Sequence, residues 1–328
     1  MKFVESVRAS LTQVMEDERA QFLGEDVLDP YGGAFKVSAG LSSKYPDRVH
    51  TTPISEGAII GVATGMAMRG LRPVAEIMFG DFLTLCADQI VNHATKFAAM
   101  YNGKVKVPMI VRSPVGAGRG YGPTHSQSLE KMFLGTPHLR VIAPSHAHDP
   151  GELLAQAYTA GGVTLFLEHK MLYPLELFAG SNLISRKVGA GAFPSVTLCN
   201  HDRRSPCDII LVGFGGSSRL FVPALELLAA EEIRASAVLC AEIGAMSGDL
   251  LVECRQAERI LVVDEASAGF NWSSEVVAFL YDQLVPNLRH PIGRLNSECD
   301  IIPTSRAQEE VAIVTTAKII EKVWGMLK

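Results

Sequence analysis

The chain has 328 residues, of which 48% are hydrophobic and 20% charged, and its formal net charge is −5. This composition is typical of a globular protein with enough apolar residues for two domains of ordinary size. The acidic balance and the lack of a dense Lys/Arg run exclude a typical nucleic-acid-binding protein, and no apolar run reaches the length of a membrane span.

The cysteines and the N-terminal sequence indicate the compartment. The start of the chain shows neither the apolar core of a secretory signal nor an Arg-rich transit segment. No Cys-x-x-Cys pair occurs, and most cysteines lie in apolar surroundings, as is typical of reduced thiols. They are Cys86, Cys199, Cys207, Cys240, Cys254 and Cys299. We therefore expect a cytoplasmic protein.

Strands and helices alternate along the first half of the chain. Short apolar runs predict strands at 21–23, 49–52, 73–78, 108–112, 140–144 and 163–168. Helical patterns predict helices at 4–18, 37–45, 56–70, 81–100 and 150–160. Near-continuous apolar strands that alternate with helices indicate a parallel sheet covered on both faces.

The second half repeats this organisation after a polar, proline-bearing segment at 193–206, which predicts a linker. Strands are predicted at 208–212, 235–239 and 259–263, and helices at 220–230, 246–255 and 315–327. The predicted fold class is therefore α/β with two parallel-sheet domains. We place the first domain at 1–192, the linker at 193–206 and the second domain at 207–328.

The stretch 51–70 places one acidic residue, Glu56, at the head of a helix built from small apolar residues. A carboxylate in the first turn is favoured by the helix dipole, with Ser55 or Thr52 as the cap. Alternatively, Glu56 lies at the rim of an apolar pocket and takes part in proton chemistry on a ligand. The residues of this stretch alone leave both interpretations open.

A glycine-rich segment, 113–123, follows a predicted strand and leads to His125. Such a loop indicates a mobile or closely approached backbone, which is common where a ligand enters. His125 can donate a proton to a bound group, or it can serve only as a hydrogen-bonding residue of the loop. The sequence pattern does not decide between these roles.

Two further motifs are weak. The run Gly213-Phe214-Gly215-Gly216 follows a strand, but Ser218 occupies the third glycine position of a dinucleotide fingerprint, so a plain turn between strand and helix is favoured. His146, His148 and Asp149 have no spaced partner group and are interpreted as polar residues at a helix start rather than as a metal site. Neither a Walker loop nor a Gly-x-Ser-x-Gly motif occurs, so the chain offers no phosphate cradle of its own.

Taken together, these motifs resemble the β subunit of the thiamine-diphosphate-dependent E1 component of 2-oxoacid dehydrogenase complexes. The resemblance covers most of Val4 to Tyr173 in order, and the second half resembles the family's C-terminal domain more loosely. The matching segments are Gly24-Glu25-Asp26, Tyr31-Gly32-Gly33, Thr52-Pro53-Ile54-Ser55-Glu56-Gly57, Glu76-Ile77-Met78-Phe79, Asp88-Gln89-Ile90-Val91-Asn92, Arg112-Ser113-Pro114, His125-Ser126-Gln127-Ser128 and Leu172-Tyr173. The resemblance implies a transketolase-like pyrimidine-binding domain followed by a transketolase C-terminal-like domain.

The resemblance also implies a cofactor and the residues that act on it. Thiamine diphosphate carries the carbanion chemistry, and the protein supplies orientation and proton control. Glu56 is expected to protonate or hydrogen-bond N1′ of the aminopyrimidine, and Phe82 to stack on that ring. Met78 and Ile54 are the other residues expected to contact the cofactor. His125 is expected to lie near the reacting carbon and to serve acyl transfer.

The rest of the site is expected on another chain. In the family, the diphosphate and its Mg²⁺ are bound by an α subunit, so the resemblance implies an α₂β₂ assembly and no activity from this chain alone. A monovalent cation, K⁺, is expected at backbone carbonyls of Val107, Met109 and Ile110. A lipoyl acyltransferase, E2, is a further expected partner, while no nucleic acid or membrane is expected.

The chain departs from the family near its end. It reads Cys299-Asp300-Ile301-Ile302-Pro303-Thr304 where relatives usually carry a Pro-x-Pro-Tyr-like run, which leaves the E2 partner open. Our main hypothesis is an oxidoreductase subunit that decarboxylates a 2-oxoacid and passes the acyl group to a lipoyl arm. The alternatives are a split transketolase-like or acyloin-forming carboligase, and a binding module without catalysis.

Overall fold

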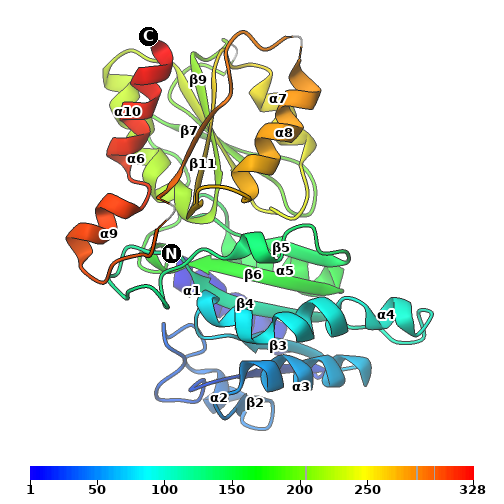
Figure 1. The fold of residues 1–328 in the computed structure, drawn as a ribbon. Coiled ribbons are helices and arrows are strands. Elements are labelled where there is room, and N and C mark those ends of the chain that lie inside the picture. The colour runs from blue at the N-terminus through cyan, green and yellow to red at the C-terminus, as the bar shows by residue number, and fades with distance from the viewer. Residues whose placement is uncertain (204, 286, 299) are drawn as a thin grey trace.

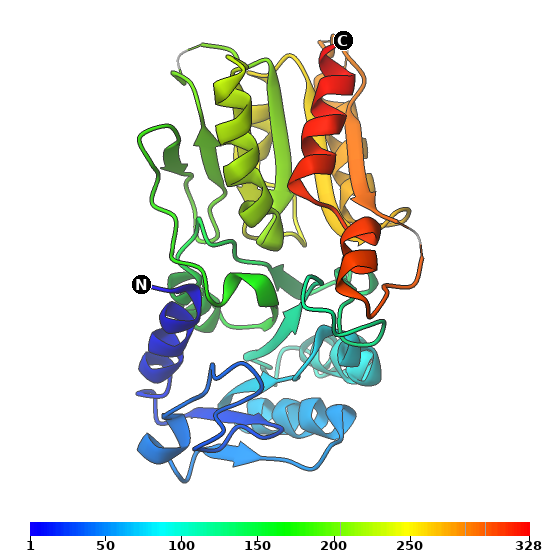
Figure 2. The ribbon, with the colours of Figure 1, turned by 90° about the vertical axis from the view of Figure 1, so that its left-hand side faces the viewer.

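The computed structural model describes residues 1–203, 205–285, 287–298 and 300–328, so Cys299 of the C-terminal run and Arg204 of the predicted linker lie outside the described residues. Two α/β units lie one above the other, and the N-terminus lies at the level where they meet (Figures 1 and 2). Within the described ranges, no helix combines the length and apolar character needed to span a membrane.

The first unit is a six-stranded sheet with every neighbouring pair parallel, in the order β2-β1-β3-β4-β6-β5. Its strands are β1 Ala20–Gly24, β2 Val49–Thr51, β3 Arg72–Glu76, β4 Met109–Val115, β5 Leu139–Ile142 and β6 Val163–His169. The central strands β4 and β6 are buried along their whole length. This confirms the prediction of a parallel sheet covered on both faces.

Alternate residues of these strands enter two separate apolar layers. In β4, Val111 packs with the layer that includes α3, Glu56–Met68, whereas Ile110 packs with the opposite layer. That opposite layer is formed by α1, Phe3–Val14, and α5, Pro150–Ala160. The short helix α2 covers Leu41–Lys44.

The second unit is also a six-stranded sheet, ordered β12-β11-β9-β10-β8-β7. Its strands are β7 Ser185–Val188, β8 Val196–Cys199, β9 Ile209–Phe214, β10 Ala235–Cys240, β11 Ile260–Ser267 and β12 Gly293–Ser297. Helices α6, Ser218–Ala230, and α10, Thr316–Leu327, cover one face, and α7, Gly248–Cys254, and α8, Trp272–Leu284, cover the other (Figure 1). The helix α9, Arg306–Ala312, extends from this unit toward the first.

The predicted linker is the clearest correction to the domain boundaries. Part of the segment 193–206 is strand β8, which is fully buried and pairs antiparallel with β10 and with β7. The second unit therefore begins before the predicted boundary, and its sheet is mixed rather than wholly parallel. Short strands of this kind escape sequence reasoning because register and pairing, rather than length, stabilise them.

The long helix predicted at 81–100 is also wrong in its form. The chain instead makes a 3₁₀ turn at Gly80–Cys86, called η1, a π-helical turn at Gln89–Ala94 and a short α4 at Phe97–Met100. A Cβ on Gly80 would lie 2.6 Å from Val115 Cγ1, and the Asp81 carboxylate accepts a 2.8 Å hydrogen bond from Gln127 Nε2. These tertiary contacts override local helix propensity.

Candidate active site

Glu56 opens α3, directly after the strand β2 and its short connection. Only 6% of the residue is exposed. Neither predicted cap serves the helix in the described structure: the Ser55 side chain makes no capping hydrogen bond, and Thr52 Oγ1 is buried without a partner. The structure therefore does not show the side-chain cap from Ser55 or Thr52 that was expected if Glu56 served only to favour the helix dipole.

Polar atoms that lack a hydrogen-bond partner lie close to this helix start. Within the residues that the structure describes, they are Thr52 Oγ1, Glu25 Oε1 and Gln89 Oε1. Gln89 Oε1 lies 3.4 Å from the position of a Cβ on Gly57, and Glu25 lies near Glu56, since burial and then the Glu56 charge raise the pKa of Glu25. Buried polar atoms in native proteins are nearly always satisfied, so this set fits a ligand that brings hydrogen-bonding groups of its own.

His125 lies in a group of aromatic rings that come from η1 and the residue before it. The His125 ring centroid is 4.7 Å from that of Phe79 and 5.2 Å from that of Phe82, both edge-on. Cys86 ends the same turn, where burial and then the charge of Glu56 raise its thiol pKa to about 12. The turn η1 therefore connects the His125 rings with the Glu56 region. Phe79 was not predicted as a site residue.

Lys170 contacts this group of rings and was not predicted from the sequence. Its side chain is fully buried and Nζ donates a hydrogen bond to the backbone carbonyl of His125. The ammonium lies 5.3 Å from the ring centroid of Phe79, and burial lowers the pKa of Lys170 to about 8. The sequence feature that could have indicated Lys170 is the run of polar, ionisable residues at 168–170, which ends an otherwise apolar strand.

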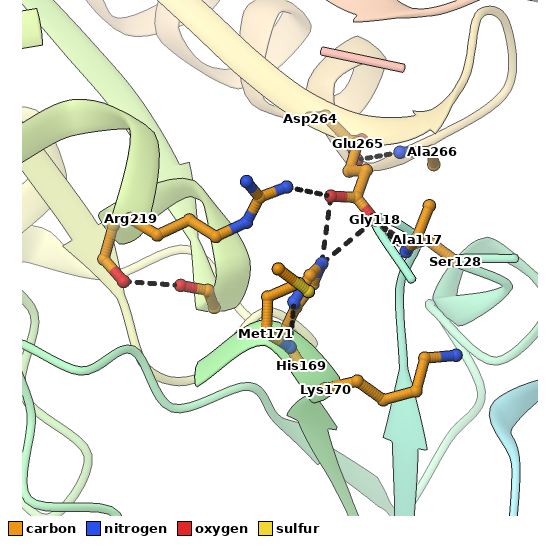
Figure 3. Close-up of polar contacts among 12 residues, drawn as sticks. Ala117, Gly118, Ser128, His169, Lys170, Met171, Arg219, Asp264, Glu265 and Ala266 are labelled. Carbon is orange, nitrogen blue, oxygen red and sulfur yellow. Dashed lines mark hydrogen bonds and ion pairs between the residues drawn. The ribbon is translucent and has the colours of Figure 1, made fainter. Parts of the chain in front are cut away.

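A second polar cluster joins the two units at the glycine-rich loop (Figure 3). Glu265 on β11 accepts hydrogen bonds from His169 Nε2 at 2.9 and 3.0 Å and from the backbone N–H of Ala117 at 2.8 Å. Burial opposes its ionisation, but His169 and Arg219, 3.5 Å away, hold the pKa of Glu265 well below its usual range. The side chain of Lys170 points away from this cluster (Figure 3).

A cavity of about 550 Å³ opens beside the residues that follow His125. Its walls come from both units, and Ser126 Oγ and Ser297 Oγ, which belong to its lining residues, have no hydrogen-bond partner in the described part of the chain. The other lining residues include Gln127, Ser128, Glu265, Glu298 and Ile302. The cavity therefore borders the segment that directly follows His125 and has room for a small molecule.

The remaining predicted site residues lie apart from one another. Met78 is half-buried, close to η1, whereas Ile54 is 86% exposed and contacts solvent in the single chain. Val107, Met109 and Ile110 lie at the opposite end of β4 from the glycine-rich loop, and Met109 and Ile110 are paired in the sheet. The structure therefore does not bring these three residues close to His125.

The two weak motifs have structural roles. His146 and His148 make 2.7 Å hydrogen bonds to Ser218 Oγ and Ser145 Oγ, and Asp149 caps α5. No cluster of three or more His, Cys, Asp or Glu side chains among the described residues could hold a metal ion. In the turn after β9, a Cβ on Gly216 would lie 2.3 Å from His169 Cδ2. The missing side chain of this glycine therefore makes room for the His169 ring, rather than for a dinucleotide.

Comparison with known proteins identifies the class of the fold. Residues 4–176 match the transketolase pyrimidine-binding domain and residues 199–319 match the transketolase C-terminal domain. A structure titled as the inactive β4 tetramer of a split-gene transketolase is similar, with a TM-score of 0.73 and 19% identity, over 100% of this chain and 98% of that chain. The fold is therefore of the transketolase-like class.

The sequence relatives narrow this class. The chain is 32% identical to the β subunit of an acetoin:2,6-dichlorophenolindophenol oxidoreductase from Cupriavidus necator, over 96% of this chain and 95% of the relative. It is 31% identical to the 2-oxoisovalerate dehydrogenase β subunit of Bacillus subtilis, over 97% and 96%. It is also 30% identical to the pyruvate dehydrogenase E1 β subunit of Chaetosphaeridium globosum, over 99% and 97%. The chain belongs to the thiamine-dependent family of E1 β subunits of 2-oxoacid dehydrogenases, as the sequence motifs had indicated.

Proposed function

We propose that this chain is the β subunit of an enzyme that oxidatively decarboxylates a 2-oxoacid and transfers the acyl group to a lipoyl group, with the active site shared with an α subunit. The observation that carries the proposal is the buried carboxyl of Glu56 at the start of α3, with Thr52, Glu25 and Gln89 presenting unpartnered polar atoms nearby within the described chain. The family membership and the nearby His125 rings support it.

The residues present fit the pyrimidine half of thiamine diphosphate. When bound, the cofactor supplies the nucleophilic carbon that cleaves the bond between a carbonyl and a carboxylate. Glu56 holds a proton at N1′ of the aminopyrimidine, and its burial keeps water away from that proton. Phe82 presents the apolar surface on which the ring stacks, with Met78 and Ile54 as further contacts.

His125 acts on the substrate side of the same site. Its ring packs edge-on against the rings of Phe79 and Phe82, and its Nδ1 lies 3.0 Å from Thr124 Oγ1, so these contacts orient the imidazole. A fixed imidazole can move a proton to or from the oxygen of a reacting acyl group, and orientation is a major part of its catalytic effect.

The partner chain supplies what this chain lacks. The family places the Mg²⁺ ligands and the diphosphate site on its α subunit, so we assign both to the α partner in an α₂β₂ assembly. We keep the backbone carbonyls of Val107, Met109 and Ile110 as a proposed K⁺ site and E2 as a proposed partner. The five described cysteines are buried and unpaired, which supports a cytoplasmic location.

The test combines the chain with its α partner, thiamine diphosphate, Mg²⁺ and a panel of 2-oxoacids. We expect Glu56→Ala to lower kcat by at least about 100-fold, because proton control at N1′ contributes that much to such chemistry. The control is Glu18→Ala, an exposed glutamate outside the site. Full activity of Glu56→Ala would refute the proposal. Transfer of the acyl group to an aldehyde instead of a lipoyl domain would identify the carboligase alternative.

A further inference from the structure

Glu309 on α9 is a fully buried glutamate that the proposed chemistry does not use. Its two carboxylate oxygens accept hydrogen bonds from backbone N–H groups of the other unit, from Gly118 at 3.0 Å and from Gly120 at 2.9 Å. Hydrogen bonds from backbone N–H groups to a carboxylate are among the stronger ones in proteins. Figure 2 shows α9 reaching from the second unit to the level of these loops.

Further contacts from the second unit fix the same loop. Glu265 accepts from the N–H of Ala117 at 2.8 Å, so two carboxylates bind three N–H groups within 117–120. Thr304 lies against the loop as well, since a Cβ on Gly122 would be 2.8 Å from Thr304 Oγ1. Of the two predicted possibilities, a mobile or a closely approached backbone, the structure therefore shows the second: the C-terminal unit contacts the loop from Ala117 to Gly122.

The fixed loop leads directly to His125. The N–H of His125 donates to the carbonyl of Gly122 at 3.3 Å, and the ring of Tyr121, one residue after Gly120, lies 6.1 Å from that of Phe79. A displacement at Gly118 or Gly120 is therefore passed to the imidazole over a few residues. Shifts of about 1 Å at a reacting group can cost a factor of about 100 in rate.

We propose that Glu309 is a positioning residue for His125, which fixes the glycine-rich loop from the C-terminal domain and so sets where the imidazole stands in the active site. This inference rests on the role proposed for His125. It gives the second domain a part in catalysis although none of the catalytic residues proposed here belongs to it.

Glu309→Gln is the informative variant because it keeps the side-chain volume. A glutamine presents one oxygen to the loop, and its amide N–H₂ then faces the second backbone N–H, where two donors meet. Glu310→Gln is the matched control, since Glu310 is the next residue of the same helix and is exposed. It makes the same chemical change without touching the loop.

The first measurement is hydrogen exchange at Gly118 and Gly120, in the full chain and in its assembly with the α subunit, thiamine diphosphate and Mg²⁺. We expect Glu309→Gln to raise exchange there about tenfold or more, because a hydrogen bond to a charged group is typically worth at least that factor. Exchange elsewhere should match the wild type, the thermal midpoint should fall by no more than a few degrees, and Glu310→Gln should match the wild type in both measurements. Unchanged exchange in the loop would overturn the proposal.

The second measurement separates kcat from KM. We expect Glu309→Gln to lower kcat about 10- to 100-fold while KM for the 2-oxoacid and the cofactor affinity stay within about twofold, because orientation rather than binding is lost. A freed loop with unchanged kcat contradicts the positioning role, as does a loss of kcat that follows a loss of global stability. Double mutation with His125→Ala should add no further loss.

The two proposals fail in distinguishable ways. If the wild-type assembly turns over no 2-oxoacid, the proposed function fails, while loop exchange still decides whether Glu309 fixes the loop. In that case the imidazole signals of His125 in chain labelled with ¹³C-histidine replace the kinetic readout. They should shift in Glu309→Gln and not in Glu310→Gln, and unshifted signals would overturn the positioning role.

Discussion

At the scale of single residues, the most costly arrangement is the buried charge network at the carboxyl ends of the central strands. Arg112 on β4 donates to both oxygens of Glu168 on β6 at 2.6 and 2.8 Å and also to Glu76 on β3. Tyr173 adds a 3.0 Å hydrogen bond to Glu168. All four side chains are buried, so each charge depends on its partners.

Removal of Arg112 tests this dependence. Arg112→Met leaves two buried carboxylates without their cation, and we expect a loss of about 3–5 kcal/mol in the free energy of unfolding. Arg19→Met, which removes an exposed pair with Asp17, should cost at most about 1 kcal/mol. Urea unfolding of both variants measures the difference. Equal losses would mean that the network does not stabilise the first unit.

At the scale of elements, two glycines from different units lie against the imidazole of His169. Gly116, which follows β4, and Gly216, in the turn before α6, both face His169, and a Cβ on Gly116 would lie 2.1 Å from its Nε2. Gly116 also has a φ of +89°, a conformation that disfavours other residues. This close approach lets His169 reach Glu265 across the boundary between the units.

Gly116→Ala should therefore disturb the junction itself. We expect a loss of at least about 2 kcal/mol, because the methyl group displaces His169 and the backbone is strained. The contrast is Gly61→Ala on the exposed side of α3, where no described atom lies within 4 Å of the new methyl group. In the isolated chain that change should stabilise by up to about 1 kcal/mol. Thermal unfolding that ranks the two variants in the other order contradicts this account.

At the scale of the whole molecule, the two units share one apolar core. Two buried acidic side chains, Glu130 of the first unit and Asp264 of the second, form what we call the acidic seam. One apolar layer contains Val111 of the first sheet together with Val212 of the second. Beside it, burial and then the nearby charge of Asp264 raise the pKa of Glu130 to about 8. Burial likewise raises the pKa of Asp264 to about 6.

This seam predicts a dependence of stability on pH. A carboxyl whose pKa is higher in the folded state binds more protons when folded, so its contribution is complete below its unfolded pKa near 4.5 and is lost as the pH rises to about 8. Because buried histidines such as His148 titrate in the opposite sense, we compare the wild type with a variant: between pH 5 and pH 8 we expect the thermal midpoint of the wild type to fall by several degrees relative to that of Glu130→Gln. The exposed Glu258→Gln should keep the wild-type slope. Parallel slopes in all three proteins would contradict the assignment.

The sequence by itself determined the class of the fold and singled out candidate site residues. Continuous apolar strands specify a covered parallel sheet, and the glutamate before a small-residue helix and the histidine after a glycine-rich loop are local patterns. Such patterns pointed to Glu56 and His125 but left their roles open, and the resemblance to the E1 β family assigned expected roles to these two residues and to Phe82.

Only the tertiary structure decided what holds those residues in place. The broken helix at 80–100, the strands within 185–199 and the contacts of Lys170, Glu265 and Glu309 with the loop all depend on partners far away in sequence. A hydrogen bond between residues 191 positions apart leaves no local pattern to find. For this reason the glycine-rich sequence left a mobile and a closely approached loop both open, and the contacts of the second domain with the loop favour the second of these.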